Sequence, residues 1–285
     1  MTYLAAGTVS TSMHSTPVQG TARQSVLLPV ALAVLAVLIV SAPNLIDPMI
    51  RFDDYPALFA EPALYWDKTR NEGCWLNYLW HLRETTTPAW VNFAAYQVLW
   101  ALMAGFIAVA STRGTEARVW FTIVLALLIV VSPPATLIAL WFNTLLPGMA
   151  LMALYAGLGL VMSRRAHLAL LVPFTVLGFM AYTTYPLLLL AIALVGAREH
   201  TLKGLIGILA LFTASFVLAV LCVYGLNLTF HGVFGVPVDE WRQATPAYDW
   251  DSLLANLPLV TTSVGTFLSR SSFEFVPMIY FHLGL

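Results

Sequence analysis

The sequence predicts an all-α protein, a polytopic transmembrane helical bundle of about seven spans with an extracytoplasmic loop that bears amphipathic interfacial helices. Of the 285 residues, 60% are hydrophobic and only 9% are charged, whereas a typical soluble domain is about 25% charged. Several apolar runs reach the roughly 20 residues that a helix needs to cross the hydrocarbon core. The 13 basic and 14 acidic residues nearly cancel, so no net field favours a nucleic-acid partner.

The first third of the chain holds a polar tail, two apolar runs and the most polar region of the protein. Residues 1–24 are rich in Ser, Thr and Gly and predict a disordered cytoplasmic tail. Ser25 to Ile46 is a charge-free first span, and it is too long for the core of a cleaved signal peptide. Asp47 to Pro88 (47–88) forms the first periplasmic loop, with seven acidic and four basic residues, and Ala89 to Ser111 is the second span.

The remaining apolar segments predict further spans. Val119 to Met162 is long enough for two spans, with a turn expected near Asn143 to Gly148. Leu168 to Ala197 is broken at Ala181 to Pro186, which predicts two short spans or a re-entrant pair. Gly204 to Phe230 is another charge-free span.

The distribution of basic residues predicts the orientation. Short cytoplasmic links carry an excess of Lys and Arg. We therefore expect a cytoplasmic N-terminus, the loop at 47–88 and a second segment at 231–252 on the periplasmic side, and 25–285 as a single membrane domain. The chain stops inside a new apolar segment, so a C-terminal truncation is expected. The residues expected on the cytoplasmic side are Arg23, Arg113, Arg118, Arg164, Arg165, Arg198 and Lys203.

Candidate chemistry gathers in the first loop. Asp53 and Asp54 follow the first span closely, and a carboxylate at that place could accept a proton from an attacking hydroxyl. A solvated acidic turn at a helix end is the alternative. Pro62 suits the first turn of a helix and Gly73 its end, and an amphipathic helix is expected from Cys74 to Glu84.

Aromatic and basic side chains surround this acidic pair in the sequence. Aromatic faces bind sugar rings, and cations hold phosphate groups, although interfacial aromatic belts and ion pairs within the loop explain the same residues. The candidate substrate-binding residues are Arg51, Tyr55, Trp66, Lys68, Arg70, Trp75, Trp80 and Arg83, with Trp90 nearby.

Other sites of chemistry find little support. Cys74 and Cys222 are too few for a disulfide framework, and the six histidines show no metal-ligand spacing. We therefore expect no metal or other cofactor, although the sequence leaves open whether the protein uses a divalent cation. The predicted spans contain no Asp, Glu, Lys or Arg, which argues against an ion-coupled transporter.

The segment RFDDYPALF, followed by ALYWDKTRNEGCWLNYLW after a single span, resembles the GT-C membrane glycosyltransferases, and most closely the Gtr-type O-antigen glucosyltransferases. Further similarities are Ser132-Pro133-Pro134 and the run GFMAYTTYP. The resemblance implies a bacterial inner-membrane enzyme that moves a sugar from a polyprenyl-phosphate donor to a periplasmic glycan acceptor, with Asp53 or Asp54 as catalytic carboxylate. Cys74 stands where that family pattern leads us to expect Arg.

Two alternatives belong to other classes of protein. A non-catalytic membrane subunit, or a truncated relative, would pack through its apolar faces against a membrane-protein partner in a larger complex. A transporter of a hydrophobic substrate needs no charge in its spans. Membrane lipid is a partner in every case.

Overall fold

The computed structural model describes residues 19–113, 119–132, 138–196, 201–237, 247–271 and 280. Within these residues the chain is helical and has no strand. Five of the helices are long and apolar enough to cross a membrane, and three shorter apolar helices lie at Val26–Val40, Val119–Val130 and Tyr185–Val195. This confirms the all-helical class of fold, and the five helices have the length and composition of membrane spans.

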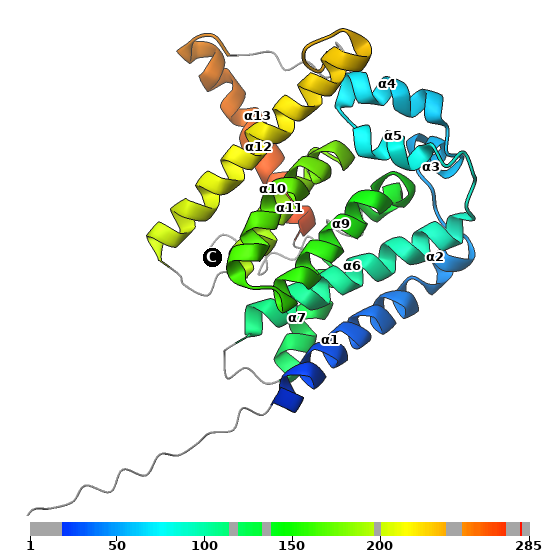
Figure 1. The fold of residues 1–285 in the computed structure, drawn as a ribbon, viewed down its shortest axis with the longest axis vertical. Coiled ribbons are helices and arrows are strands. Elements are labelled where there is room, and N and C mark those ends of the chain that lie inside the picture. Colours follow the sequence, from blue (N-terminus) through cyan, green and yellow to red (C-terminus); the bar gives the residue numbers. More distant parts are fainter. Residues whose placement is uncertain are drawn as a thin grey trace, which may run out of the picture.

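Figure 1 shows the helices in chain order. The first part comprises α1 (Gln19–Val40), α2 (Ala42–Ile46), η1 (Phe52–Asp54), α3 (Tyr55–Leu58), α4 (Pro62–Glu72), α5 (Trp75–His81) and α6 (Ala89–Thr112). The second part comprises α7 (Val119–Val130), η2 (Ala139–Trp141), α9 (Phe142–Val161), α10 (Arg164–Ala181), α11 (Tyr185–Val195), α12 (Leu202–His231) and α13 (Trp250–Ser271).

Several expected boundaries are confirmed. Pro62 opens α4, and Gly73 ends it in the left-handed conformation at φ 74°, where glycine pays no Cβ penalty. The expected break after Ala181 separates α10 from α11. Helix α1 begins at Gln19, inside the segment expected to be a disordered tail, and residues 1–18 lie outside the described part of the chain.

Two expectations about local structure are wrong. Asn143 to Gly148 is not a turn, because these residues form the first turns of α9, where Pro147 is accommodated close to the helix start. The connection lies earlier, between Val130 and Ala139. The helix expected from Cys74 to Glu84 covers only Trp75–His81. Leu79 and the capping residue Leu82 are exposed, whereas Trp75 is buried.

Small residues bring the helices of the first core close together. Helices α1, α6 and α7 share a cluster that includes Ala33, Ala101 and Ala104. A Cβ atom added at Gly105 would lie 3.0 Å from the Cα atom of Val30, so the backbones of α1 and α6 nearly touch. Helices in a membrane associate through this kind of close packing, because burial of apolar surface provides no driving force there.

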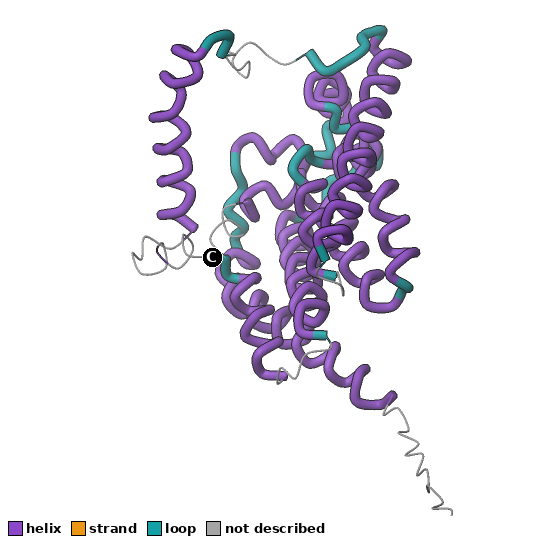
Figure 2. Tube along the Cα trace, turned by 90° about the vertical axis from the view of Figure 1, so that its left-hand side faces the viewer, coloured by secondary structure: helices purple, strands orange, loops and turns teal. Residues whose placement is uncertain are grey.

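The second core lies among α6, α9, α10 and α11, with Tyr96, Phe142, Tyr155, Leu171 and Leu189 almost fully buried. Figure 2 shows α13 standing apart from this bundle, and none of the described residues in its apolar window Trp250–Ser269 is buried.

The bundle has two chemically different ends, which the hydrogen bonds identify. At the loop end, α4 and α5 lie over the start of α9 and the ends of α10 and α12 (Figure 1). At the basic end, Arg113 donates to the Leu160 carbonyl (3.0 Å) and Arg164 to the Ala193 carbonyl (2.8 Å). The acidic loop and these two arginines therefore lie at opposite ends of the helices.

Candidate functional site

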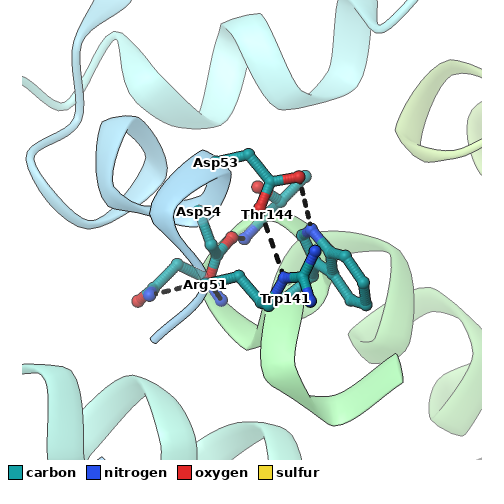
Figure 3. Close-up of polar contacts among 6 residues, drawn as sticks. Arg51, Asp53, Asp54, Trp141 and Thr144 are labelled. Atoms are coloured by element: carbon teal, nitrogen blue, oxygen red, sulfur yellow. Dashed lines mark hydrogen bonds and ion pairs between the residues drawn. The ribbon is translucent and has the colours of Figure 1, made fainter. Parts of the chain in front are cut away.

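An exposed carboxylate lies at the loop end, where Asp53 meets the start of α9. The indole N–H of Trp141 donates to Asp53 Oδ2 at 2.9 Å, and Arg51 Nε lies 3.9 Å from Asp53 Oδ1. The Arg51 guanidinium also stands 4.8 Å from the centre of the Trp141 ring. Figure 3 shows the three side chains together. The Asp53 side chain keeps 45% of its surface exposed, so a bound molecule can reach it.

Asp54 points the other way, into the protein. Its side chain is fully buried and accepts hydrogen bonds from the backbone N–H groups of Asn143 (3.0 Å) and Thr144 (2.8 Å) and from the Asn143 amide (2.9 Å). These backbone groups belong to the first turn of α9, whose N–H groups have no partner within the helix. Asp54 therefore serves as a capping residue supplied from a remote segment, and its charge suits the positive end of the helix dipole.

Burial raises the pKa of the Asp54 carboxyl above its ordinary value, and hydrogen bonds from Thr144 and Asn143 offset part of that rise. The two neighbouring aspartates thus have different environments. Asp53 is accessible and held by Arg51 and Trp141, whereas every oxygen of Asp54 is already occupied by protein donors.

A buried hydrogen-bonded chain extends from Asp54 into the bundle. The Asn143 amide that donates to Asp54 accepts from Asn92 of α6 (2.7 Å), and Asn92 accepts from Thr87 (2.8 Å). With the bond between Thr144 and Tyr65 included, the network joins four segments of the chain. Polar groups buried in this way are costly unless they are paired, so the chain of bonds fixes the position of the acidic loop.

The network around Asp54 also reaches the loop helices α4 and α5, through Thr144. The hydroxyls of Thr144 and Tyr65 share a hydrogen bond (3.0 Å), and the Tyr65 ring stacks on His81 at 3.7 Å between ring centres. His81 Nδ1 bonds the Asn77 carbonyl, and its Nε2 is buried without a partner among the described residues. Burial lowers the pKa of His81 to about 4, with Arg83 contributing in the same direction. The imidazole is therefore neutral at pH 7.

Trp66 and Trp75 gather on the other side of the loop helices, against the end of α12. Their rings lie 5.8 Å apart, and both contact His231. The Trp75 indole N–H donates to the fully buried Asn227 (2.9 Å), which in turn donates to the Arg70 carbonyl (3.1 Å). Trp75 is 6% exposed, so its ring anchors α5 to α12 and offers no open face to a sugar.

The other predicted binding residues lie on the rim of the loop. Arg83 donates to the carbonyls of Trp80 (3.0 Å) and Ala57 (3.3 Å), which joins the end of α5 to α3. Lys68 lies 5.1 Å from the centre of the Tyr65 ring. The exposed members are Tyr55, Arg70 and Trp80, together with Trp90. The structure thus brings Arg51 and Asp53 together, whereas Trp66 with Trp75, and Trp80 with Arg83, form separate contacts.

Three residues of the site were missed by sequence reasoning, namely Trp141, Asn143 and Thr144. These hydrogen-bonding side chains interrupt an apolar block, and that interruption was the sequence feature that could have indicated a site. It was interpreted as a turn between spans, and the contacts with residues 53 and 54 are 88 to 90 positions apart in the chain.

Among the described residues, no three His, Cys, Asp or Glu side chains form a group that could hold a metal ion. No protein-family model, curated protein or solved structure matches this chain.

Proposed function

We propose that this protein is a membrane glycosyltransferase that moves a hexose from a polyprenyl-phosphate donor to a lipid-linked or surface glycan, with Asp53 as general base. The observation that carries the proposal is the environment of Asp53: an exposed carboxylate held by an arginine and an indole, at the end of the bundle opposite Arg113 and Arg164. A general base must be reachable by the hydroxyl that it deprotonates, which favours Asp53 over the buried Asp54.

The proposed reaction uses groups that lie side by side at this end. Asp53 takes the proton from an acceptor hydroxyl, whose oxygen forms a bond to the anomeric carbon of the sugar. The bond between that carbon and the phosphate oxygen breaks, and the polyprenyl phosphate leaves with the electron pair. The exposed Arg51 guanidinium is placed to bind the developing phosphate charge, and the Trp141 N–H orients Asp53.

The membrane arrangement is part of the proposal. We place the N-terminus in the cytoplasm of a bacterium and the loop on the periplasmic side of its inner membrane, because the basic residues lie at the other end of the helices. Arg113 and Arg164 bond carbonyls there, and Lys203 lies at the start of α12, whose opposite end contacts Trp75 of the loop. The seven expected spans correspond to α1, α6, α7, α9, α10, α11 and α12. Helices α7 and α11, with 12 and 11 residues, extend only about 16 to 18 Å, which makes them the two short crossings of the proposal.

The test compares two carboxylates of one loop. Asp53→Asn removes the base but keeps a side-chain oxygen that can accept the hydrogen bond from Trp141. The matched control is Asp47→Asn, which changes an exposed carboxylate of the same loop. Sugar transfer is measured by mass spectrometry of surface glycans and by transfer from a labelled polyprenyl-phosphate sugar in proteoliposomes. We expect at least a hundredfold loss for Asp53→Asn and wild-type activity for Asp47→Asn. Full activity of Asp53→Asn refutes the mechanism.

One observation favours a second candidate, a membrane subunit of a larger complex. Among the described residues, no side chain in the apolar window of α13 is buried, and this helix stands apart from the bundle (Figure 2). A partner helix packed on α13 would explain this position. This candidate predicts that the protein co-purifies with another membrane protein and that a charged substitution at Leu257 abolishes the co-purification. It also predicts that Asp53→Asn has no effect, whereas the glycosyltransferase proposal predicts a loss of sugar transfer.

A further inference from the structure

A pocket of about 120 Å³ opens between α1, α6 and η2, near the loop end of the bundle. It arises because α7 ends at Val130, while α1 continues to Val40 and α6 runs beside it. The indole N–H of Trp100 donates to the Val130 carbonyl (3.3 Å), which holds the end of α7 in place. Beyond that point Val131 and Ala139 of η2 form the third wall, and the space between them and the two long helices is the pocket.

The walls of the pocket are apolar except at two places. Val37, Val40 and Ala139 contribute hydrocarbon, and the polar exceptions are Ser41 and Gln97. These two residues are 7% and 8% exposed, and neither side chain forms a hydrogen bond to another described residue. Backbone and side-chain polar groups at membrane depth are costly when unpaired, because no water is present to bond them. The carboxamide and the hydroxyl therefore call for a partner that enters the pocket.

The position of the pocket indicates the chemistry of that partner. Ser41 directly follows the 15-residue apolar helix Val26–Val40, which is about 22 Å long, so the polar pair lies where hydrocarbon gives way to the oxygen-rich layer of the bilayer. No charged side chain lines the pocket among the described residues. An uncharged hydrogen-bonding group attached to an apolar chain therefore fits better than a phosphate.

We propose that this pocket binds one acyl chain of a glycerophospholipid, whose ester oxygens accept hydrogen bonds from the Gln97 amide and the Ser41 hydroxyl. The proposal does not depend on the glycosyltransferase function. It has a local consequence, since Ala139 lines the pocket and Trp141, two residues farther along η2, bonds Asp53. Two residues correspond to about 4 Å along a 3-10 helix, so a bound lipid supports the segment that orients Asp53.

The experiment uses the full-length protein in bilayers that contain a phospholipid with a photoreactive group in its acyl chain, close to the ester. Cross-linked peptides are mapped by mass spectrometry. We expect cross-links to concentrate at residues 36–41 and 97–100. Ala36→Trp fills the pocket, and Leu35→Trp puts the same ring on the exposed side of the same helix as the matched control. We expect at least a fivefold loss of cross-linking for Ala36→Trp and no change for Leu35→Trp.

A second variant tests the hydrogen bonds, and competition tests the identity of the lipid. Gln97→Leu is expected to weaken binding about threefold to tenfold, the effect of losing one hydrogen bond. An unlabelled ester lipid should compete better than its ether analogue, which lacks the carbonyl oxygens. Cross-links spread evenly over lipid-facing residues, equal competition by the ether lipid, or stronger competition by a polyprenyl phosphate would overturn the proposal. The wild-type map decides it even if a variant fails to fold.

Discussion

Removing the Asp54 carboxylate should destabilise the protein far more than removing its neighbour Asp53. Asp54 is fully buried and accepts three hydrogen bonds at the start of α9. In Asp54→Ala, the two backbone N–H groups and the Asn143 amide lose their acceptor inside the protein. The variant therefore loses a helix cap and leaves buried donors without a partner.

The magnitude follows from the contacts. A capping acceptor is worth about 0.5–2 kcal/mol, and each buried donor without a partner costs about 1–3 kcal/mol. Because the three donors lie together and can share relaxation, we expect Asp54→Ala to lower the free energy of unfolding by about 3–5 kcal/mol. At about 2–4 °C per kcal/mol for a chain of this size class, the unfolding temperature falls by about 6–20 °C.

The matched control is Asp53→Ala, which removes an exposed ion pair and one indole hydrogen bond. Exposed pairs contribute about 0–1 kcal/mol, so the unfolding temperature should change by less than about 4 °C. Asp54→Asn keeps one oxygen that can accept a backbone N–H, and it should fall between the two. Unfolding is followed by intrinsic tryptophan fluorescence of the purified protein in detergent, with the same detergent and lipid content throughout.

Two results would refute this division of roles. If Asp53→Ala lowered the unfolding temperature as much as Asp54→Ala, the two carboxylates would be equivalent in structure. If Asp54→Ala unfolded like the wild type, Asp54 would not cap α9. A stable Asp54→Asn variant that lost all sugar transfer, beside an active Asp53→Asn variant, would assign the proposed base to Asp54.

Three further predictions concern other parts of the bundle. Burial lowers the pKa of His81 to about 4, below its unfolded value of about 6.5, so stability is lost as pH falls from 6.5 towards 4. The free energy of unfolding should therefore fall between pH 7.5 and pH 5 by about 2 kcal/mol more in the wild type than in His81→Gln. Gly148→Ala places a methyl group 2.1 Å from the Tyr185 ring and should cost about 1–3 kcal/mol, whereas an unchanged unfolding temperature would contradict that packing. Asn227→Leu leaves the Trp75 indole N–H unpaired, which should cost about 1–3 kcal/mol and make residues 62–81 more sensitive to protease; protection equal to the wild type would count against this anchor.

Much of the helical layout follows from local rules. The helix from Pro62 to Glu72, its glycine end and the break after Ala181 depend on residues next to one another in the chain. The turn expected near Asn143 was wrong because polar residues in an apolar block suit a turn and a capped helix start equally well. Only an acceptor from elsewhere, here Asp54, makes the second outcome favourable.

The sequence by itself determined the class of protein, since few charges and long apolar runs leave little alternative to helices in a membrane, and it directed attention to the Asp53–Asp54 pair. It did not distinguish these two adjacent carboxylates. That distinction belongs to the tertiary structure, because residues 53 and 54 point in different directions from η1 and meet different parts of a segment about ninety positions away. Helix α9 buries and occupies one carboxylate and leaves the other open, and no local pattern encodes a contact over that distance.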